Sequence, residues 1–310
     1  MITPTERSVD TNGVTLRVTE AGERGSPVVV VLAHGFPELA YSWRHQIPVL
    51  AAAGYHVLAP DQRGYGGSSR PRDIDDYNIV QLTADIAGLL DDVGADKAVL
   101  VGHDWGSPVA TNFPLFFPDR VHGVVALSVP PTPRASAPPT QIWRKIFGEN
   151  FFYILYFQEP GVADAALGAD PRQSLRRMIA LEGFGGPPET LAGRPLPPLP
   201  DWIGDDEFEH YVEAFTRTGF TGPLNWYRNF DRNWELTETT PATTITAPTL
   251  FLAGSADPVL SFTPRDRVRD VVAGDYREVM LEGAGHWLQQ ERPDEVNAVL
   301  LEFLEGLELR

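Results

Sequence analysis

The chain of 310 residues contains no cysteine, which excludes disulfide bonds, thiolate metal ligands and cysteine nucleophiles. Long apolar runs are also missing. The longest, Val28–Ala33, is far shorter than the roughly 20 residues that a membrane-spanning helix needs. The N-terminal stretch MITPTERSVD has no basic region followed by an apolar run. We therefore expect no signal peptide and a cytoplasmic protein.

Basic residues are scarce, with 25 Lys and Arg against 42 Asp and Glu and a formal net charge of −17. Such a surface repels phosphate backbones and anionic lipids, so nucleic-acid and membrane partners are not expected. The hydrophobic and charged fractions, 43% and 22%, are typical of a soluble globular protein. Its length suits one large α/β domain with an insertion, or two ordinary domains. A monomer and a homodimer both remain open.

Continuous apolar runs, each closed by turn residues, recur along the chain. Such runs are typical of strands buried on both faces of a parallel sheet. They are Pro27–Ala33, Tyr55–Ala59, Lys97–Val101, Val121–Ser128, Pro248–Ala253 and Tyr276–Leu281. Asn12-Gly13 predicts an opening hairpin, and the spacing of apolar residues predicts a helix over Leu82–Val93. Alternating strands and helices favour an α/β fold with a doubly wound sheet.

A different composition begins near Pro130, where a Pro-rich stretch is followed by many aromatic residues. A long disordered loop is the alternative here, but residues such as Trp143, Phe147 and Phe151 are too apolar to stay in solvent. We therefore predict a core domain over residues 1–130 and 236–310, interrupted by a mostly helical cap over residues 131–235. An insertion beyond the carboxyl ends of the strands would cover the crevice where such folds bind ligands.

The segment AVLVGHDWGSPVA, residues 98–110, has the pattern of a nucleophile elbow. An apolar strand leads through a strained turn into a helix, and Asp104 occupies the position of the nucleophile between Gly102 and Gly106. An ordinary aspartate that caps a helix is the alternative. A carboxylate is already ionised at neutral pH, so it needs no base before it attacks an sp³ carbon. A histidine would then be free to activate water.

Two later strand ends complete a nucleophile–acid–histidine order. Asp257 follows the strand in PTLFLAGSADPV, and His286 follows the next one in a GAGH loop. Each has a simpler interpretation, a turn residue for Asp257 and a surface residue for His286. The segment SVPPTP, after the strand Val121–Ser128, contains no competing acid. We therefore predict that Asp257 orients His286.

The HGFP sequence after the strand ending at Ala33 predicts one half of an oxyanion hole. The donors would be the backbone N–H groups of Phe36 and of Trp105, the residue after the nucleophile. A plain Gly-Pro turn is the alternative. No histidine has metal-ligand spacing, so no metal is predicted, and His34 and His103 are expected to orient backbone.

Five motifs together resemble the soluble epoxide hydrolases of the α/β-hydrolase superfamily. They are HGFPE, DQRGYGGSS, GHDWG, YILYFQEPG and GPLNWYRN. The resemblance implies an eight-stranded, mostly parallel sheet with a helical cap. It also implies two cap tyrosines that hydrogen-bond the epoxide oxygen, Tyr153 and Tyr227, with Tyr156 as the alternative to Tyr153 one helical turn away.

The resemblance implies a reaction in which Asp104 opens a small apolar epoxide and His286-activated water hydrolyses the resulting ester to a vicinal diol. No cofactor takes part. A haloalkane or haloacid dehalogenase also uses an aspartate nucleophile with a histidine and an acid. Phe36 and the paired tyrosines disfavour that function here. A serine-type esterase is disfavoured by Asp104. A non-catalytic ligand-binding relative is disfavoured by the complete set of catalytic residues.

Overall fold

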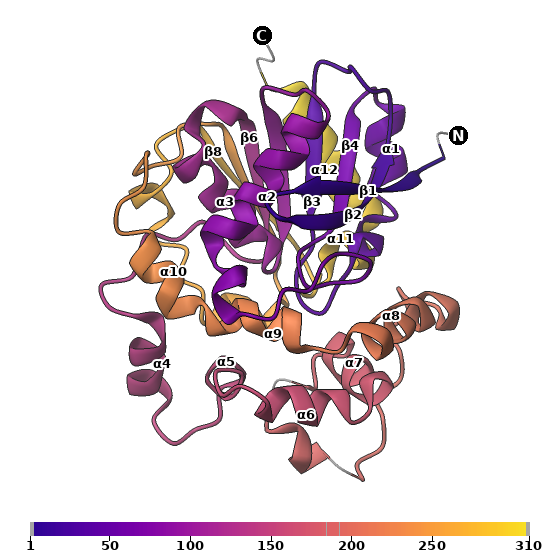
Figure 1. Ribbon diagram of the computed structural model, residues 1–310, viewed down its shortest axis with the longest axis vertical. Helices are drawn as coiled ribbons and strands as arrows, with labels where there is room; N and C mark the ends of the chain where they lie inside the picture. Colours follow the sequence, from indigo (N-terminus) through magenta and orange to yellow (C-terminus); the bar gives the residue numbers. More distant parts are fainter. Residues whose placement is uncertain (1–2, 184, 192, 308–310) are drawn as a thin grey trace. The chain divides into compact units, whose positions relative to one another are not determined.

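The computed structural model describes residues 3–183, 185–191 and 193–307, which divide into two units (Figure 1). The first unit contains residues up to 62, residues 80–133 and residues from 239 onward. The second contains residues 63–79 and 134–238.

A single eight-stranded sheet forms the centre of the first unit. Its strands, in chain order, are β1 (Thr5–Thr11), β2 (Val14–Ala21), β3 (Val29–Ala33), β4 (His56–Asp61), β5 (Ala98–His103), β6 (Val121–Leu127), β7 (Thr249–Gly254) and β8 (Tyr276–Leu281). They lie in the order β1-β2-β4-β3-β5-β6-β7-β8. The pairs β1–β2 and β2–β4 are antiparallel and the others are parallel. The prediction of a mostly parallel eight-stranded sheet is confirmed.

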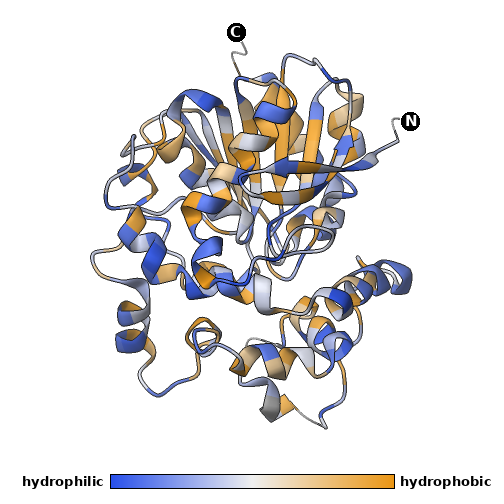
Figure 2. Cartoon of the chain, in the orientation of Figure 1, coloured by the Kyte–Doolittle hydropathy of each residue, from blue (hydrophilic) through white to orange (hydrophobic). Residues whose placement is uncertain are grey.

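The predicted strands coincide with observed strands because their side chains are buried on both faces. Every residue of β3, β5 and β7 is buried. Figure 2 shows these central strands as the most apolar part of the unit. The hairpin between β1 and β2 turns at Asn12-Gly13, where both φ angles are positive, 45° and 75°. An Asn-Gly pair accepts such angles at little cost.

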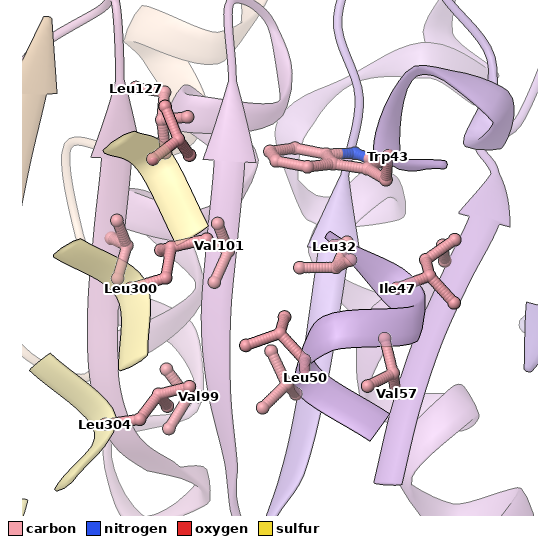
Figure 3. Close-up of a cluster of buried hydrophobic side chains, with 14 of the residues drawn as sticks. Leu32, Trp43, Ile47, Leu50, Val57, Val99, Val101, Leu127, Leu300 and Leu304 are labelled. Atoms are coloured by element: carbon pink, nitrogen blue, oxygen red, sulfur yellow. The ribbon is translucent and has the colours of Figure 1, made fainter. Parts of the chain in front are cut away.

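Helices cover both faces of the sheet (Figure 1). One face packs against α1 (Ile47–Ala52), α11 (Leu288–Glu291) and α12 (Pro293–Glu305), and Figure 3 shows Leu32, Val101 and Leu300 meeting in this apolar layer. On the other face lie α2 (Ile79–Asp92) and α3 (Gly106–Phe116). Short 3₁₀ helices complete the unit: η1 (Ala40–Trp43), η3 (Pro118–Arg120), η5 (Pro258–Ser261) and η6 (Val268–Asp270).

The second unit is helical. Its elements are η2 (Ile74–Tyr77), α4 (Pro139–Phe147), α5 (Tyr153–Tyr156), α6 (Val162–Gly168), α7 (Pro171–Ile179), η4 (Pro188–Leu191), α8 (Asp205–Thr218), α9 (Thr221–Arg228) and α10 (Phe230–Leu236). Aromatic side chains hold it together, as the aromatic composition of this region suggests. The ring of Phe147 stacks on Phe152 at 4.0 Å, and Trp143 meets Phe230 edge-on at 4.7 Å.

Residues 63–79 join this helical unit through hydrogen bonds to α9 and its neighbours. The Trp226 indole N–H donates to the carbonyl of Arg63 at 3.1 Å. The side chain of Asn229 donates to the carbonyl of Ile74 at 2.6 Å. Backbone carbonyls of this segment thus find partners in side chains of the second unit. Among the described residues, no helix has the length and apolar character required to cross a membrane.

Candidate active site

Asp104 lies at the sharp turn between β5 and α3. Its φ angle is +49°, in the left-handed region that costs a residue with a side chain about 1–2 kcal/mol. The turn is held by two backbone hydrogen bonds. The N–H of Asp104 donates to the carbonyl of Leu127 at 3.3 Å, and that of Ser107 donates to the carbonyl of Asp104 at 3.0 Å. This strained turn places the carboxyl group beside Gly35 and His286.

The glycines on either side of Asp104 permit a close approach of backbones. A Cβ atom on Gly102 would lie 2.0 Å from the carbonyl oxygen of Gly106, and one on Gly106 would lie 1.9 Å from that of Ala33. Any larger residue would push α3 away from the sheet and displace Asp104.

Two backbone N–H groups bind the Asp104 carboxylate. The N–H of Phe36 donates to Oδ1 at 2.8 Å, and the N–H of Trp105 also acts on this carboxylate. A Cβ on Gly35 would lie 2.5 Å from the same oxygen, so the loop can approach Asp104 only with glycine there. The two predicted donors therefore both bind the Asp104 carboxylate, and Phe36 binds it at Oδ1, as an oxyanion hole requires.

His286 faces the other oxygen of the Asp104 carboxylate. Its Nε2 lies 3.7 Å from Oδ2, and its Nδ1 lies 3.1 and 3.0 Å from the two carboxylate oxygens of Asp257. Asp257 Oδ1 also accepts the N–H of Val259 at 2.9 Å, so the same residue caps η5 and orients the histidine. The three residues, which come from three different strand ends, thus meet at one edge of the sheet.

Burial and neighbouring charges shift the pKa values of Asp104 and His286. Burial raises the pKa of Asp104, and the positive charges of His286 and His103 and the N–H groups of Phe36 and Trp105 oppose that rise only in part. Burial by itself would lower the pKa of His286, but the carboxylates of Asp257, Asp104 and Glu38 outweigh it and raise the value to about 9. The resting site therefore holds a protonated histidine between two carboxylates.

This charge coupling gives a first prediction. Because the Asp104 carboxylate helps to hold the proton, Asp104→Ala should lower the pKa of His286 from about 9 by about one unit or more. Titration of the His286 ring by NMR in both proteins measures the change. An unchanged pKa in the variant would mean that the two side chains are not electrostatically coupled.

Two side chains that were not among the predicted site residues also contact this group. Ser128, at the end of β6, donates its hydroxyl to the carbonyl of His286 at 3.0 Å. Glu38 accepts the N–H of Gly35 at 3.0 Å and lies 2.6 Å from Nδ1 of His103. Glu38 closes the HGFPE motif, and that motif is the sequence signal for it. As expected, His34 and His103 both contact backbone groups, at Gly35 and at His286.

The two predicted tyrosines meet in the second unit. The rings of Tyr153 and Tyr227 are 6.1 Å apart at 75°, and both rings pack edge-on against Phe157. Tyr156 packs against Phe151 and Phe157. The ring contact with Tyr227 makes Tyr153 the better partner of the pair.

Polar side chains fix the two helices that carry these tyrosines. Gln158 donates to the carbonyl of Ile154 and to that of Tyr227, each at 2.9 Å, so it ties α5 to α9. Arg228 donates to the carbonyl of Phe157 at 3.1 Å and forms an ion pair with Asp164. These contacts explain why a Gln and an Arg accompany the tyrosines in the motifs YILYFQEPG and GPLNWYRN.

Known proteins resemble this chain over nearly its full length. The α/β-hydrolase fold model matches residues 28–293. Epoxide hydrolase A of Mycobacterium tuberculosis is 65% identical, with 99% of each chain covered. Epoxide hydrolase 3 of Siraitia grosvenorii is 37% identical over 96% of this chain and 97% of its own.

Solved structures agree with these sequence relatives. The crystal structure of epoxide hydrolase A from Mycobacterium thermoresistibile has a TM-score of 0.93 and 61% identity, with 99% of this chain and 100% of that chain covered. An epoxide hydrolase from an endophytic Streptomyces has a TM-score of 0.91 and 40% identity, with 98% and 96% covered. The chain therefore belongs to the epoxide hydrolases of the α/β-hydrolase family.

Proposed function

We propose that this protein converts a small apolar epoxide and water to a vicinal diol through an ester on Asp104. The proposal rests on the different partners of the two oxygens of that carboxylate. Oδ1 is held by the backbone N–H of Phe36, while Oδ2 faces His286, which Asp257 orients. One oxygen is placed to become an oxyanion and the other to act as nucleophile.

In the first step Oδ2 of Asp104 forms a bond to one ring carbon as the bond from that carbon to the epoxide oxygen breaks. The oxygen leaves as an alkoxide, which needs a proton or a hydrogen bond. Tyr153 and Tyr227 supply it, because a phenol with an ordinary pKa of about 10 stays protonated at neutral pH. Release of ring strain drives the step.

In the second step Nε2 of His286 takes a proton from water, and the resulting hydroxide adds to the Asp104 ester carbon. Negative charge develops on Oδ1, where the N–H groups of Phe36 and Trp105 stabilise it. Collapse of this intermediate releases the diol oxygen, which recovers the proton from His286. Ester formation has already removed the charge of Asp104, so the pKa of His286 falls from about 9. Its proton passes through solvent to the tyrosinate that the first step leaves, which restores the tyrosine and makes the neutral base available.

The helical second unit acts as the cap in this proposal and contributes both tyrosines. Two facts support the assignment: the rings of Tyr153 and Tyr227 are neighbours, and side-chain hydrogen bonds fix their helices to each other. Paired donors on one oxygen also require such a fixed separation.

The tyrosine pair yields a second prediction. Changing both Tyr153 and Tyr227 to Phe removes the donors but keeps the ring packing, so ring opening should slow by about 10²–10⁴-fold. Tyr156→Phe serves as the matched control and should retain activity. Rapid-quench measurement of the alkyl-enzyme reports ring opening directly. Wild-type ring opening in the double variant would remove the tyrosines from the mechanism.

A diol assay over a panel of epoxides tests the overall function. We expect diol from apolar epoxides and no halide release from haloalkanes or haloacids of matching size. Halide release without diol formation would assign a dehalogenase instead, and tight binding without turnover would assign a ligand-binding protein.

A further inference from the structure

The loop that carries His286 is held by a carboxylate that takes no part in the proposed reaction. Glu291, the last residue of α11, accepts one backbone hydrogen bond on each of its two oxygens. The N–H of Gly285 donates to Oε2 at 2.7 Å, and the N–H of Trp287 donates to Oε1 at 2.8 Å. Gly285 and Trp287 flank His286, so one side chain binds the backbone on both sides of the catalytic histidine.

The peptide group between Ala284 and Gly285 is bound at both ends. Its N–H donates to Glu291, and its carbonyl accepts the N–H of Ala256 at 2.9 Å. Ala256 lies in the loop that carries Asp257. A peptide group is planar, so hydrogen bonds at both of its ends fix its position and its orientation together. The histidine loop is thereby fixed against the loop of its acid partner.

The peptide group between His286 and Trp287 is bound in the same way. Its N–H donates to Glu291, whereas its carbonyl accepts the hydroxyl of Ser128 at 3.0 Å and lies 2.8 Å from Nε2 of His103. Glu291 also donates its own N–H to the carbonyl of Trp287 at 2.9 Å, so it binds both backbone polar groups of that residue. His286 therefore lies between two fixed peptide groups, which restrict rotation of the chain there.

Gly285 permits the close approach of the Glu291 carboxylate. A Cβ atom at position 285 would lie 2.8 and 3.0 Å from the two oxygens of that carboxylate. The φ angle of Gly285 is not positive, so the need for glycine is steric and not conformational. A larger residue would push the carboxylate away from both N–H groups. The glycine before His286 and the glutamate at the end of α11 therefore depend on each other.

Helix capping explains only one of the two bonds. Trp287 is the N-cap residue of α11, so a partner for its N–H stabilises the start of that helix. Gly285 lies outside the helix, and its bond to Glu291 adds nothing to the helix end. By comparison, Asp164 and Glu207 cap α6 and α8 by accepting a single N–H each, at 3.0 and 2.9 Å. The second bond of Glu291 serves the histidine loop.

We propose that Glu291 is a positioning residue for His286, which sets the backbone of the histidine loop so that Nε2 faces the ester formed on Asp104. Nδ1 of His286 contacts Asp257, but Nε2 lies 3.7 Å from Oδ2 of Asp104, too far for a direct hydrogen bond. The placement of the ring therefore depends on Asp257 and on the backbone that carries the ring. This inference rests on the proposed function, in which His286 acts only in the second step.

Separate rates for the two half-reactions test this role. Glu291→Gln keeps the size of the side chain but offers one acceptor oxygen in place of two, and Glu291→Ala offers none. Because a small displacement of a catalytic group is costly, ester hydrolysis should slow by about 10-fold in the Gln variant and about 10²-fold in the Ala variant. Ring opening does not use His286 and should keep its wild-type rate. Rapid-quench and single-turnover kinetics measure both rates.

Glu282→Gln is the matched control. Glu282 lies in the same loop with its side chain exposed, so the substitution removes an equal charge at the surface. Both rates should stay at wild-type values. A general loss of stability in the Glu291 variants would lower both rates by one factor, because it reduces the amount of active enzyme. Equal losses of both rates, or unchanged ester hydrolysis in Glu291→Ala, would contradict the positioning role.

Hydrogen exchange measured by NMR tests the contact without any substrate. The amide protons of Gly285 and Trp287 should exchange slowly in the wild type, and Glu291→Ala should accelerate the exchange of both. Rapid exchange of both protons in the wild type would refute the contact, whatever the enzyme does with epoxides. Absence of any alkyl-enzyme in the wild type would instead refute the proposed nucleophile, and the exchange result would still stand.

Discussion

Replacing Asp104 by Ala is expected to abolish diol formation, with a loss of at least about 10⁴-fold in kcat. In the proposed mechanism this carboxylate makes the first bond to substrate, and His286 and the oxyanion hole act only on the ester that it forms. Diol assays with purified wild type and variant measure the loss. The backbone bonds that hold the turn, to Leu127 and from Ser107, do not involve the side chain, so the fold should persist.

The left-handed backbone conformation at position 104 makes a second variant necessary, one that tolerates this conformation as Asp does. Ala tolerates a φ of +49° less well than Asp does, so part of any loss could arise from strain. Asp104→Asn keeps both the size of the side chain and the tolerance for this conformation but removes the charge. We expect Asn to be inactive in ring opening as well. Wild-type turnover in either variant would show that Asp104 is not the nucleophile.

The second large effect is expected from His286→Gln. An ionised Asp104 needs no base, so ring opening should continue, whereas ester hydrolysis should slow by about 10²–10⁴-fold. The alkyl-enzyme should accumulate, and the intact mass should rise by one substrate molecule, located on the peptide that contains Asp104. The double variant Asp104→Ala/His286→Gln should show no increment. Normal turnover by His286→Gln would remove this histidine from the mechanism.

The sequence predicts the sheet well because the buried strands are continuous apolar runs with little ambiguity. It also predicts which residues are candidates for the catalytic group. Asp104 and His286 each follow such a run in a Gly-containing turn, and parallel strands bring their carboxyl ends to one edge of the sheet. Local pattern and topology thus point to the same residues.

The polar network behind the site could not be predicted in the same way. Glu38 and His103 are 65 residues apart, and neither position carries a periodic signal that relates it to the other. Only the packed structure reveals that both nitrogens of His103 meet oxygen atoms. The sequence predicts that His103 orients backbone, which its contact with the carbonyl of His286 fits, but it does not predict the contact with Glu38.

The segment 63–79 is a second feature whose position the sequence does not predict. The motif DQRGYGGSS marks its beginning, but nothing in that motif relates the segment to the helical unit. Its association with the helical unit depends on single side-chain bonds, from Trp226 to Arg63 and from Asn229 to Ile74, that lie more than 150 residues away in sequence. Contacts of this kind become visible only when the helices are placed in three dimensions.

The central claim is that a side-chain oxygen of Asp104, and not water, makes the first bond to the epoxide. It is tested most directly by turnover in ¹⁸O-labelled water. In a single turnover with excess enzyme, the diol should contain no ¹⁸O and the Asp104 carboxyl group should gain one labelled oxygen. A labelled diol from an enzyme whose Asp104 stays unlabelled would show that water opens the ring directly, and the covalent mechanism would be wrong.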